Sequence, residues 1–280
     1  MFNLILLSFA GLFSGISQIA NKKIAKPEYP PESLTVATML LNALIAFPLL
    51  FYQFEVSLDW RHWLLTAFST IAFAFSTKFL FKAYNKTDVS LVLIIYKLNV
   101  VIVAIIGIIL LKETYNTTQS LGLFLILISS ISLVFKPRTG KLLPEGIIYV
   151  VLAAILTSFA SVSDKIILNH FSPFTYAFIN NAMIAAVFML KKNVVGEAIT
   201  IVKKDFKLLF IGSLFMTIGF VFILVALQLG DVSKILPVYS GLGLLIPVLI
   251  GIIFLNERQE ITKKLIASIV IILGSWLLIK

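Results

Sequence analysis

The stretch DVSLVLIIYKLNVV, residues 88–101, has a near-copy in DVSKILPVYSGLGL, residues 231–244. The two stretches lie 143 residues apart, and they share an opening Asp-Val-Ser triplet and an aligned tyrosine, Tyr96 and Tyr239. Matches of Leu, Ile and Val between apolar segments prove little, whereas the shared polar triplet and tyrosine indicate an internal duplication of the chain.

The surroundings of both stretches are far more apolar than a water-soluble protein allows. Of the 280 residues, 60% are hydrophobic and 13% are charged, and the mean hydropathy is +1.05. A soluble domain is roughly half apolar and about one quarter charged, so the excess apolar surface must face lipid. The chain contains no cysteine, which excludes disulfides, thiol catalysis and cysteine-based metal sites.

Ten apolar segments have the length of about 20 residues that a membrane-crossing helix needs. We therefore expect an all-α integral membrane protein with ten transmembrane helices, at residues 2–20, 33–53, 62–82, 89–111, 118–135, 145–167, 172–190, 208–228, 234–255 and 262–279. Segment 2–20 lacks a basic start and a clear cleavage site, so we interpret it as a retained first helix. Residues 195–206 are expected to form a small interfacial helix.

The duplication divides these spans into two repeats of five, at residues 1–141 and 142–280, within one membrane domain. Five is an odd number, so the second repeat must enter the membrane from the opposite side. The two halves are therefore expected to form an inverted pair, the symmetry that alternating access uses, with a binding site near the bilayer midplane.

The formal net charge of +10 is carried by short loops between apolar segments, a pattern that indicates lipid headgroups and not nucleic acid as the partner. Sixteen of the 23 Lys and Arg residues lie in loops after odd-numbered spans, and four lie on the other side. The positive-inside rule then predicts an inner or plasma membrane protein with both termini outside.

Each fourth span of a repeat ends in a Leu-x-Glu pattern, within LLKE at 110–113 and FLNER at 254–258. Two five-helix repeats with this ending resemble the EamA-type branch of the drug/metabolite transporter superfamily, over essentially the whole chain. The resemblance implies a carrier that exports or exchanges amino acids, metabolites, sugar phosphates or drugs. Specificity varies widely within such a fold, so the resemblance implies no particular substrate.

Lys97 is the charged residue that the apolar pattern explains least. It follows Asp88 by nine residues, about 13 Å along a helix, which places it near mid-bilayer and beyond comfortable snorkelling range. A charged group at that depth is costly and is commonly functional. We interpret Lys97 as a cavity cation that binds a carboxylate or phosphate; the alternative is a structural lysine that donates to helix carbonyls or pairs with Asp164.

Four further residues are candidates for the same substrate-binding cavity. Tyr96, Lys97 and Asn99 span an arc of about 160° on one helix, and the second repeat presents Tyr239 and Ser240 at the places aligned with Tyr96 and Lys97. Pro237 and Pro247, with nearby glycines, predict a kink in span 234–255. Because Ala104 aligns with Pro247, the kink is expected in one repeat only.

Asp164 is the only one of the thirteen acids that does not lie in or beside a predicted loop. It is a candidate coupling or gating carboxylate; the alternative is a residue at a helix end that merely meets water. Lys78 is expected to reach the cytoplasmic surface or, as an alternative, the cavity.

These observations together predict a secondary active transporter of a small polar solute, anionic or zwitterionic, such as an amino acid or a phosphorylated metabolite. A coupling proton is a further candidate partner. Two alternatives stay open: a lipid or lipid-linked sugar flippase, and a non-transporting membrane scaffold. We expect no enzyme, no cofactor and no metal site, because only His62 and His170 are present and no catalytic motif is found.

Overall fold

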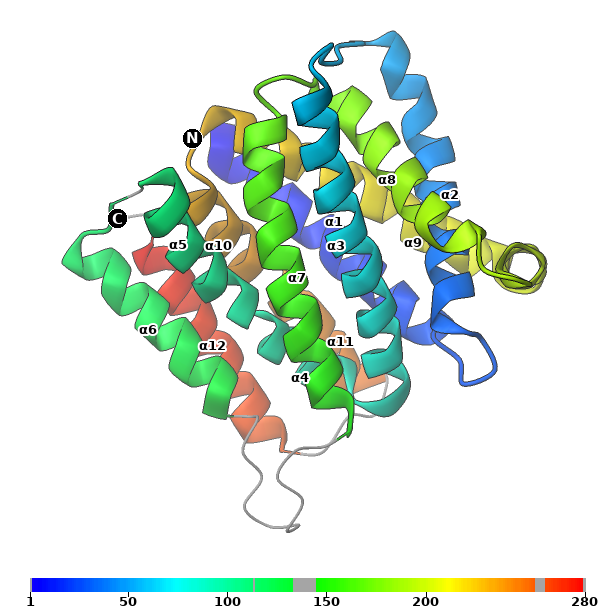
Figure 1. Ribbon diagram of the computed structural model, residues 1–280. Coiled ribbons are helices and arrows are strands. Elements are labelled where there is room, and N and C mark those ends of the chain that lie inside the picture. The colour runs from blue at the N-terminus through cyan, green and yellow to red at the C-terminus, as the bar shows by residue number, and fades with distance from the viewer. Residues whose placement is uncertain (1, 113, 133–144, 255–259, 279–280) are drawn as a thin grey trace.

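The computed structural model describes residues 2–112, 114–132, 145–254 and 260–278, and all regular elements in these ranges are helical. Glu113 and residues 255–258 of the two Leu-x-Glu patterns lie outside the described residues. In chain order the elements are α1 Phe2–Ile24, α2 Pro31–Ala46, η1 Phe47–Phe51, α3 Trp60–Lys86, α4 Val89–Tyr96, α5 Leu98–Leu111, α6 Thr117–Ser132, α7 Glu145–Ile167, α8 Pro173–Met189, α9 Val194–Leu229, α10 Val232–Leu242, α11 Leu245–Phe254 and α12 Ile261–Leu277 (Figure 1).

In the described part of the chain, each of the ten stretches that the apolar pattern indicates contains a helical segment. Within the described ranges, five of them are long and apolar enough to cross a membrane: Pro31–Phe51, Trp60–Lys86, Val89–Leu110, Gly146–Ile167 and Val194–Leu229. The apolar helices Thr117–Ser132 and Pro173–Met189 are shorter. Together these helices identify a multi-pass membrane protein.

Local sequence explains several helix starts. Asp59 caps α3, because its side chain accepts a hydrogen bond from the backbone N–H of Arg61 at 2.9 Å. Ser172 caps α8 in the same way, through the N–H of Thr175 at 3.1 Å. Prolines fill the first positions of α2 and α8, where a missing N–H costs nothing.

The helices of the two halves pack on one another instead of forming two separate bundles. The most extensive helix pairings join α3 to α7 and α1 to α9, each of them between a helix of the first half and a helix of the second. Figure 1 shows α3 and α7 side by side across the middle of the molecule. A site enclosed by these pairs is therefore built from both halves.

Both halves contain an interrupted helix, so the expectation of a kink in one repeat only was wrong. In the first half α4 ends at Tyr96 and α5 begins at Leu98. The turn between them is tight, because the N–H of Lys97 bonds the carbonyl of Ile94 at 3.2 Å and the N–H of Val100 bonds that of Lys97 at 3.0 Å. A tightened turn inside a long helix needs no proline and is a frequent feature of functional hinges.

In the second half the interruption lies between α10, which ends at Leu242, and α11, which begins at Leu245. This break precedes Pro247, which has no N–H to donate to the carbonyl of residue 243. Gly243 also approaches another backbone, since a Cβ built on it would lie 2.9 Å from the carbonyl oxygen of Gly11. The missing N–H of Pro247 and the close approach of Gly243 to the Gly11 backbone both favour a break at this point of the helix.

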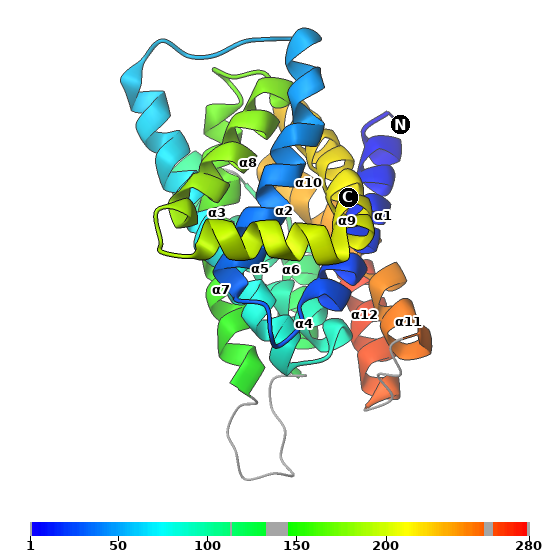
Figure 2. The ribbon, with the colours of Figure 1, turned by 90° about the vertical axis from the view of Figure 1, so that its right-hand side faces the viewer.

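The long helix α9 is bent at Asp205, where φ is −122° and ψ is 27°. Its first part, residues 194–204, lies crosswise to the bundle: Figure 1 views it end-on at the right edge, and Figure 2 shows it lengthwise. The predicted helix at 195–206 is therefore present, as the first part of α9.

Candidate functional site

A cavity of about 180 Å³ lies between the two halves. Helices α1, α2, α3, α4, α5, α7, α8, α9 and α10 all contribute side chains to its wall. The six residues singled out from the sequence all line it: Tyr96, Lys97, Asn99, Asp164, Tyr239 and Ser240. The fold thus gathers them around one space, although they come from four helices and the turn at Lys97.

Lys97 is buried, with 6% of its surface exposed, and its position in the tight turn between α4 and α5 directs it to the cavity wall. Across the described ranges we find neither a hydrogen bond from its amino group nor an ion pair with any acid, Asp164 included. The alternative of a lysine held by helix carbonyls or by Asp164 is therefore not seen. A buried cation without a protein partner is costly, and an anionic group in the cavity would relieve that cost.

Asp164 lies in the last turns of α7 and is 2% exposed. Its Oδ1 accepts hydrogen bonds from Ser69 Oγ at 2.8 Å and from the Tyr176 hydroxyl at 2.5 Å. The alternative of a helix-end carboxylate that merely meets water was therefore wrong. The cavity wall holds a cation and a carboxylate with no ion pair between them among the described residues.

The two aligned tyrosines make matching hydrogen bonds. Tyr96 donates its hydroxyl to Thr157 Oγ1 at 2.7 Å, and Tyr239 donates to Ser14 Oγ at 2.7 Å. Ser14 and Thr157 are themselves 143 residues apart, so the duplication extends to the hydrogen-bond acceptor. Ser14 and Thr157 also line the cavity; sequence reasoning missed them, although aligning the two halves around each tyrosine's partner helix would have paired them.

The amides around the cavity differ in how firmly they are held. Asn180 Oδ1 accepts from Thr70 at 3.1 Å, and Asn181 Oδ1 accepts from Asn42 at 3.2 Å. Asn99 is 8% exposed, and its Oδ1 has no hydrogen-bond partner among the described residues. A buried acceptor of this kind lacks compensation for its lost hydration, so Asn99 has spare capacity for a donor group in the cavity.

A second pair of aligned residues, Lys22 and Lys165, fixes the helix ends near the cavity. Lys165 Nζ donates to the carbonyls of Leu227 at 2.6 Å and Gly230 at 2.8 Å, at the end of α9. Lys22 Nζ makes the corresponding bonds at the end of α3, to the carbonyls of residues 84 and 87. Both lysines satisfy carbonyls that a helix end leaves unpaired.

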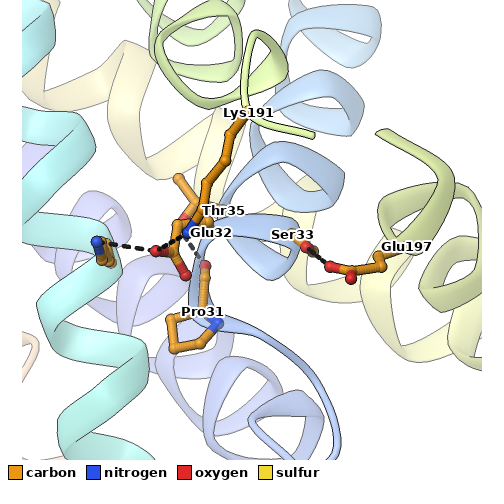
Figure 3. A network of polar contacts seen from close by, with 7 residues as sticks. Pro31, Glu32, Ser33, Thr35, Lys191 and Glu197 are labelled. Atoms are coloured by element: carbon orange, nitrogen blue, oxygen red, sulfur yellow. Dashed lines mark hydrogen bonds and ion pairs between the residues drawn. The ribbon is translucent and has the colours of Figure 1, made fainter. Parts of the chain in front are cut away.

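An ionic cluster lies beside the start of α2 (Figure 3). Glu32 Oε1 lies 2.9 Å from Lys78 Nζ on α3 and 2.9 Å from Lys191 Nζ after α8. The next residue, Ser33, donates its hydroxyl to Glu197 on α9, and Figure 3 shows these two side chains pointing toward each other. Lys78 does not line the cavity; it ties α3 to α2, a role that the sequence did not predict.

Metal ligands do not gather in the described part of the chain, where no group of three or more His, Asp or Glu side chains could hold an ion. His62 at the start of α3 and His170 between α7 and α8 stack, with ring centroids 3.6 Å apart, and both lie outside the cavity wall. The cavity therefore offers binding groups: one cation, one carboxylate, hydroxyls and amides.

A solved structure and a protein family resemble this chain. A solved structure described as "Crystal structure of protein" superposes with a TM-score of 0.65 at 16% sequence identity, over 98% of this chain and 96% of that chain. At that identity the likeness shows the fold alone. No curated protein matches the chain.

The model of the EamA-like transporter family matches the chain twice, at residues 1–135 and 144–280. The two matches cover nearly the whole sequence and leave residues 136–143 between them. Members of this family are transporters and not enzymes. The chain belongs to the EamA-like transporter family of the drug/metabolite transporter superfamily and is a multi-pass membrane transporter.

Proposed function

We propose that this transporter is a secondary active carrier of a small anionic or zwitterionic metabolite, of the amino acid or phosphorylated metabolite class. The observation that carries the proposal is the buried Lys97 ammonium, which lines the cavity between the two halves without a protein partner among the described residues. A carboxylate or phosphate of the solute would supply the missing counter-charge through charge-assisted hydrogen bonds.

Asp164 on the same wall favours a solute that also carries a cationic group, or a proton that is carried with the solute. Its Oδ1 is committed to Ser69 and Tyr176, and no described residue bonds the second oxygen. Lys97 and Asp164 together would orient a zwitterion across the cavity, with Asn99 and Ser240 as additional polar contacts.

Alternating access is the mechanism that the two-repeat organisation favours. The ten helical segments would cross the inner or plasma membrane as two inverted five-helix repeats, with both termini outside. Helices α4, α5 and α10 border the cavity, and the breaks between α4 and α5 and between α10 and α11 would supply the bending points. Matching tyrosine and lysine contacts in the two halves support this symmetry.

The polarity and the size of the cavity favour a small-solute carrier over the two alternatives, a scaffold and a lipid or lipid-linked sugar flippase. A scaffold needs no polar space around a buried lysine. A lipid-linked sugar needs a larger site, since pockets for drug-sized ligands are about 300–1,000 Å³ and this cavity is about 180 Å³. A small solute fits the observed space better.

Uptake into proteoliposomes tests the proposal. Purified wild type, Lys97→Met and Lys82→Met would be compared with radiolabelled anionic, zwitterionic, neutral and cationic solutes of similar size, each with and without a pH gradient. Lys82 is a matched control, because it is a lysine on α3 that does not line the cavity. We expect wild type and Lys82→Met to carry an anionic or zwitterionic solute and Lys97→Met to lose that transport. Transport of cationic solutes alone, or wild-type rates in Lys97→Met, would contradict the proposal.

A further inference from the structure

The first part of α9 and its flanks, residues 192–207, form a surface that the transport site does not use. We call it the surface segment. It lies crosswise to the bundle (Figure 2) and borders none of the central cavity, which α9 reaches only from Met216 onward.

The surface segment has three faces. At about 100° per residue, Val194, Ala198 and Ile201 share the face that packs on the bundle, and all three are buried. Val195 and Ile199 share a second face and are 36% and 51% exposed. A helix that is apolar on an exposed face is not adapted to water on that side.

The exposed apolar face continues beyond the bend into the membrane-crossing part of α9. Phe206 and Phe210 follow it, 53% and 40% exposed, with their rings stacked at a centroid distance of 5.8 Å. Since residues 206–229 belong to an apolar helix long enough to cross a membrane, the apolar face of the surface segment is continuous with the lipid-facing surface of the bundle.

The third face is polar and positively charged. Gly196 and Thr200 are exposed on it, and four lysines lie along or beside it: Lys192, Lys203, Lys204 and Lys207. Within the described ranges these lysines form no ion pair and no side-chain hydrogen bond. Four positive charges that make no ion pair among the described residues therefore border an exposed apolar stripe, although Lys204 also interacts electrostatically with the neighbouring Asp205.

The two acids of the segment make their hydrogen bonds elsewhere, and neither forms an ion pair with a lysine of this face in the described ranges. Asp205 Oδ2 accepts from Lys26 Nζ and from the Tyr29 hydroxyl, both at 2.7 Å, and Glu197 accepts from Ser33. The hydrogen bond between Lys26 and Asp205 raises the pKa of Lys26 and lowers the pKa of Asp205, so the pair is ionised at neutral pH. Both acids thus anchor the segment to the loop between α1 and α2 and to the start of α2.

We infer that the surface segment is a docking site for anionic phospholipids, with Val195 and Ile199 at the acyl boundary and Lys203 and Lys207 on the lipid phosphates. An amphipathic helix with basic residues beside its apolar face has the pattern of an interfacial helix. Each lysine near an anionic leaflet contributes about 1 kcal/mol, or roughly a fivefold change in association.

Lipid selectivity is the first test. Spin-labelled phosphatidylglycerol and phosphatidylcholine would be compared for their association with the reconstituted protein. We expect wild type to prefer phosphatidylglycerol by more than about twofold, and Lys203→Gln/Lys207→Gln to lower that preference clearly, with the remainder carried by the lysines that are left. A control, Lys23→Gln/Lys263→Gln, removes the same charge from the end of α1 and the start of α12, where Lys263 is paired with Glu260, and is expected to keep the preference. Equal association in wild type, or an unchanged preference in the Lys203/Lys207 variant, would overturn the inference.

A second test locates the helix relative to the bilayer. The chain has no cysteine, so spin labels can be attached to single cysteines introduced at positions 195, 196, 199 and 200. Labels at 195 and 199 are expected to be accessible to oxygen and shielded from an aqueous nickel complex, and labels at 196 and 200 to show the reverse. Four labels that are equally accessible to the aqueous reagent would contradict the lipid contact, as would labels at 195 and 199 shielded from both reagents by a protein partner.

Discussion

Tyr96 and Tyr239, 143 residues apart, occupy equivalent positions: each donates its hydroxyl at 2.7 Å to a hydroxyl on the helix that opens the other half, Thr157 on α7 or Ser14 on α1. Each bond joins an interrupted helix of one repeat to the other repeat across the cavity wall. The two halves are therefore connected twice by the same chemistry, although their cavity charges differ.

Removing either hydroxyl should weaken the fold modestly. Tyr96→Phe and Tyr239→Phe are each expected to lower the free energy of unfolding by about 0.5–1.5 kcal/mol, the net value of one hydrogen bond. Thermal unfolding in detergent would measure this, with Tyr52→Phe as the control, since Tyr52 is 78% exposed. Unchanged melting temperatures for both cavity variants would show that these bonds do not hold the halves together.

Asp164→Asn tests proton coupling separately from solute binding. The amide preserves the size of the side chain and can still accept from Ser69 and Tyr176, but it cannot exchange a proton. We expect solute exchange to persist and accumulation driven by a pH gradient to fall at least tenfold. Measuring both in the same proteoliposomes separates the two functions; full gradient-driven accumulation by Asp164→Asn would assign the coupling proton to another group.

Glu32→Gln should destabilise the protein, because it leaves Lys78 without its carboxylate. The side chain of Lys78 is only 18% exposed, whereas that of Lys191 is 61% exposed. A cost of about 1–3 kcal/mol is expected, below the range for a fully buried pair because one partner is solvated. Glu28→Gln in the neighbouring loop is the control. Equal melting temperatures for the two variants would mean that the cluster of Figure 3 contributes little to stability.

Gly243→Ala should lower the stability of the protein, whereas Gly196→Ala should not. A Cβ on Gly243 would lie 2.9 Å from the Gly11 carbonyl oxygen, whereas a Cβ on Gly196 would meet nothing within 4 Å. Backbone cannot move aside cheaply, so a cost of about 1–3 kcal/mol is expected at Gly243. At Gly196 a gain of about 0.5–1 kcal/mol is expected, since alanine favours a helix. The reverse order of stabilities would contradict the packing described between α1 and α10–α11.

The helical segments and the cavity residues were predictable because both leave local signals. Apolar runs of bilayer length determine the segments, and a lysine or an aspartate inside such a run is conspicuous without any knowledge of its neighbours. The shared Asp-Val-Ser triplet and tyrosine also made the duplication visible. All six candidate residues consequently lie on one cavity wall, although the duplication did not predict the hydroxyl partners of the tyrosines.

Other features depend on distant partners or on backbone bonding and leave no such signal. Glu32 meets Lys191 across 159 residues, so its role could not be predicted from its loop. The sequence places Asp164 near the end of a predicted helix. Its role as a buried, hydrogen-bonded carboxylate depends on Ser69 and Tyr176, which are distant in the sequence or on another helix. A tightened turn can form with ordinary residues. The break at Lys97 therefore needs no proline or glycine nearby, and the sequence does not predict it.

Lys97→Met isolates the central claim in one position. The substitution keeps the length and apolar stem of the side chain and removes a buried charge without a described partner, so the empty protein should become more stable, by about 2–4 °C in melting temperature per kcal/mol gained. Wild-type stability or better would also show that a loss of transport does not reflect misfolding.

The most direct measurement is the affinity of wild type and Lys97→Met for the transported solute, determined by calorimetry in nanodiscs at neutral pH. A charge-assisted hydrogen bond contributes about 1.5–3 kcal/mol, so we predict that the variant binds the solute roughly 10–150-fold more weakly while it remains folded. An affinity within twofold of wild type would contradict the account, because the solute would then not rely on the Lys97 ammonium.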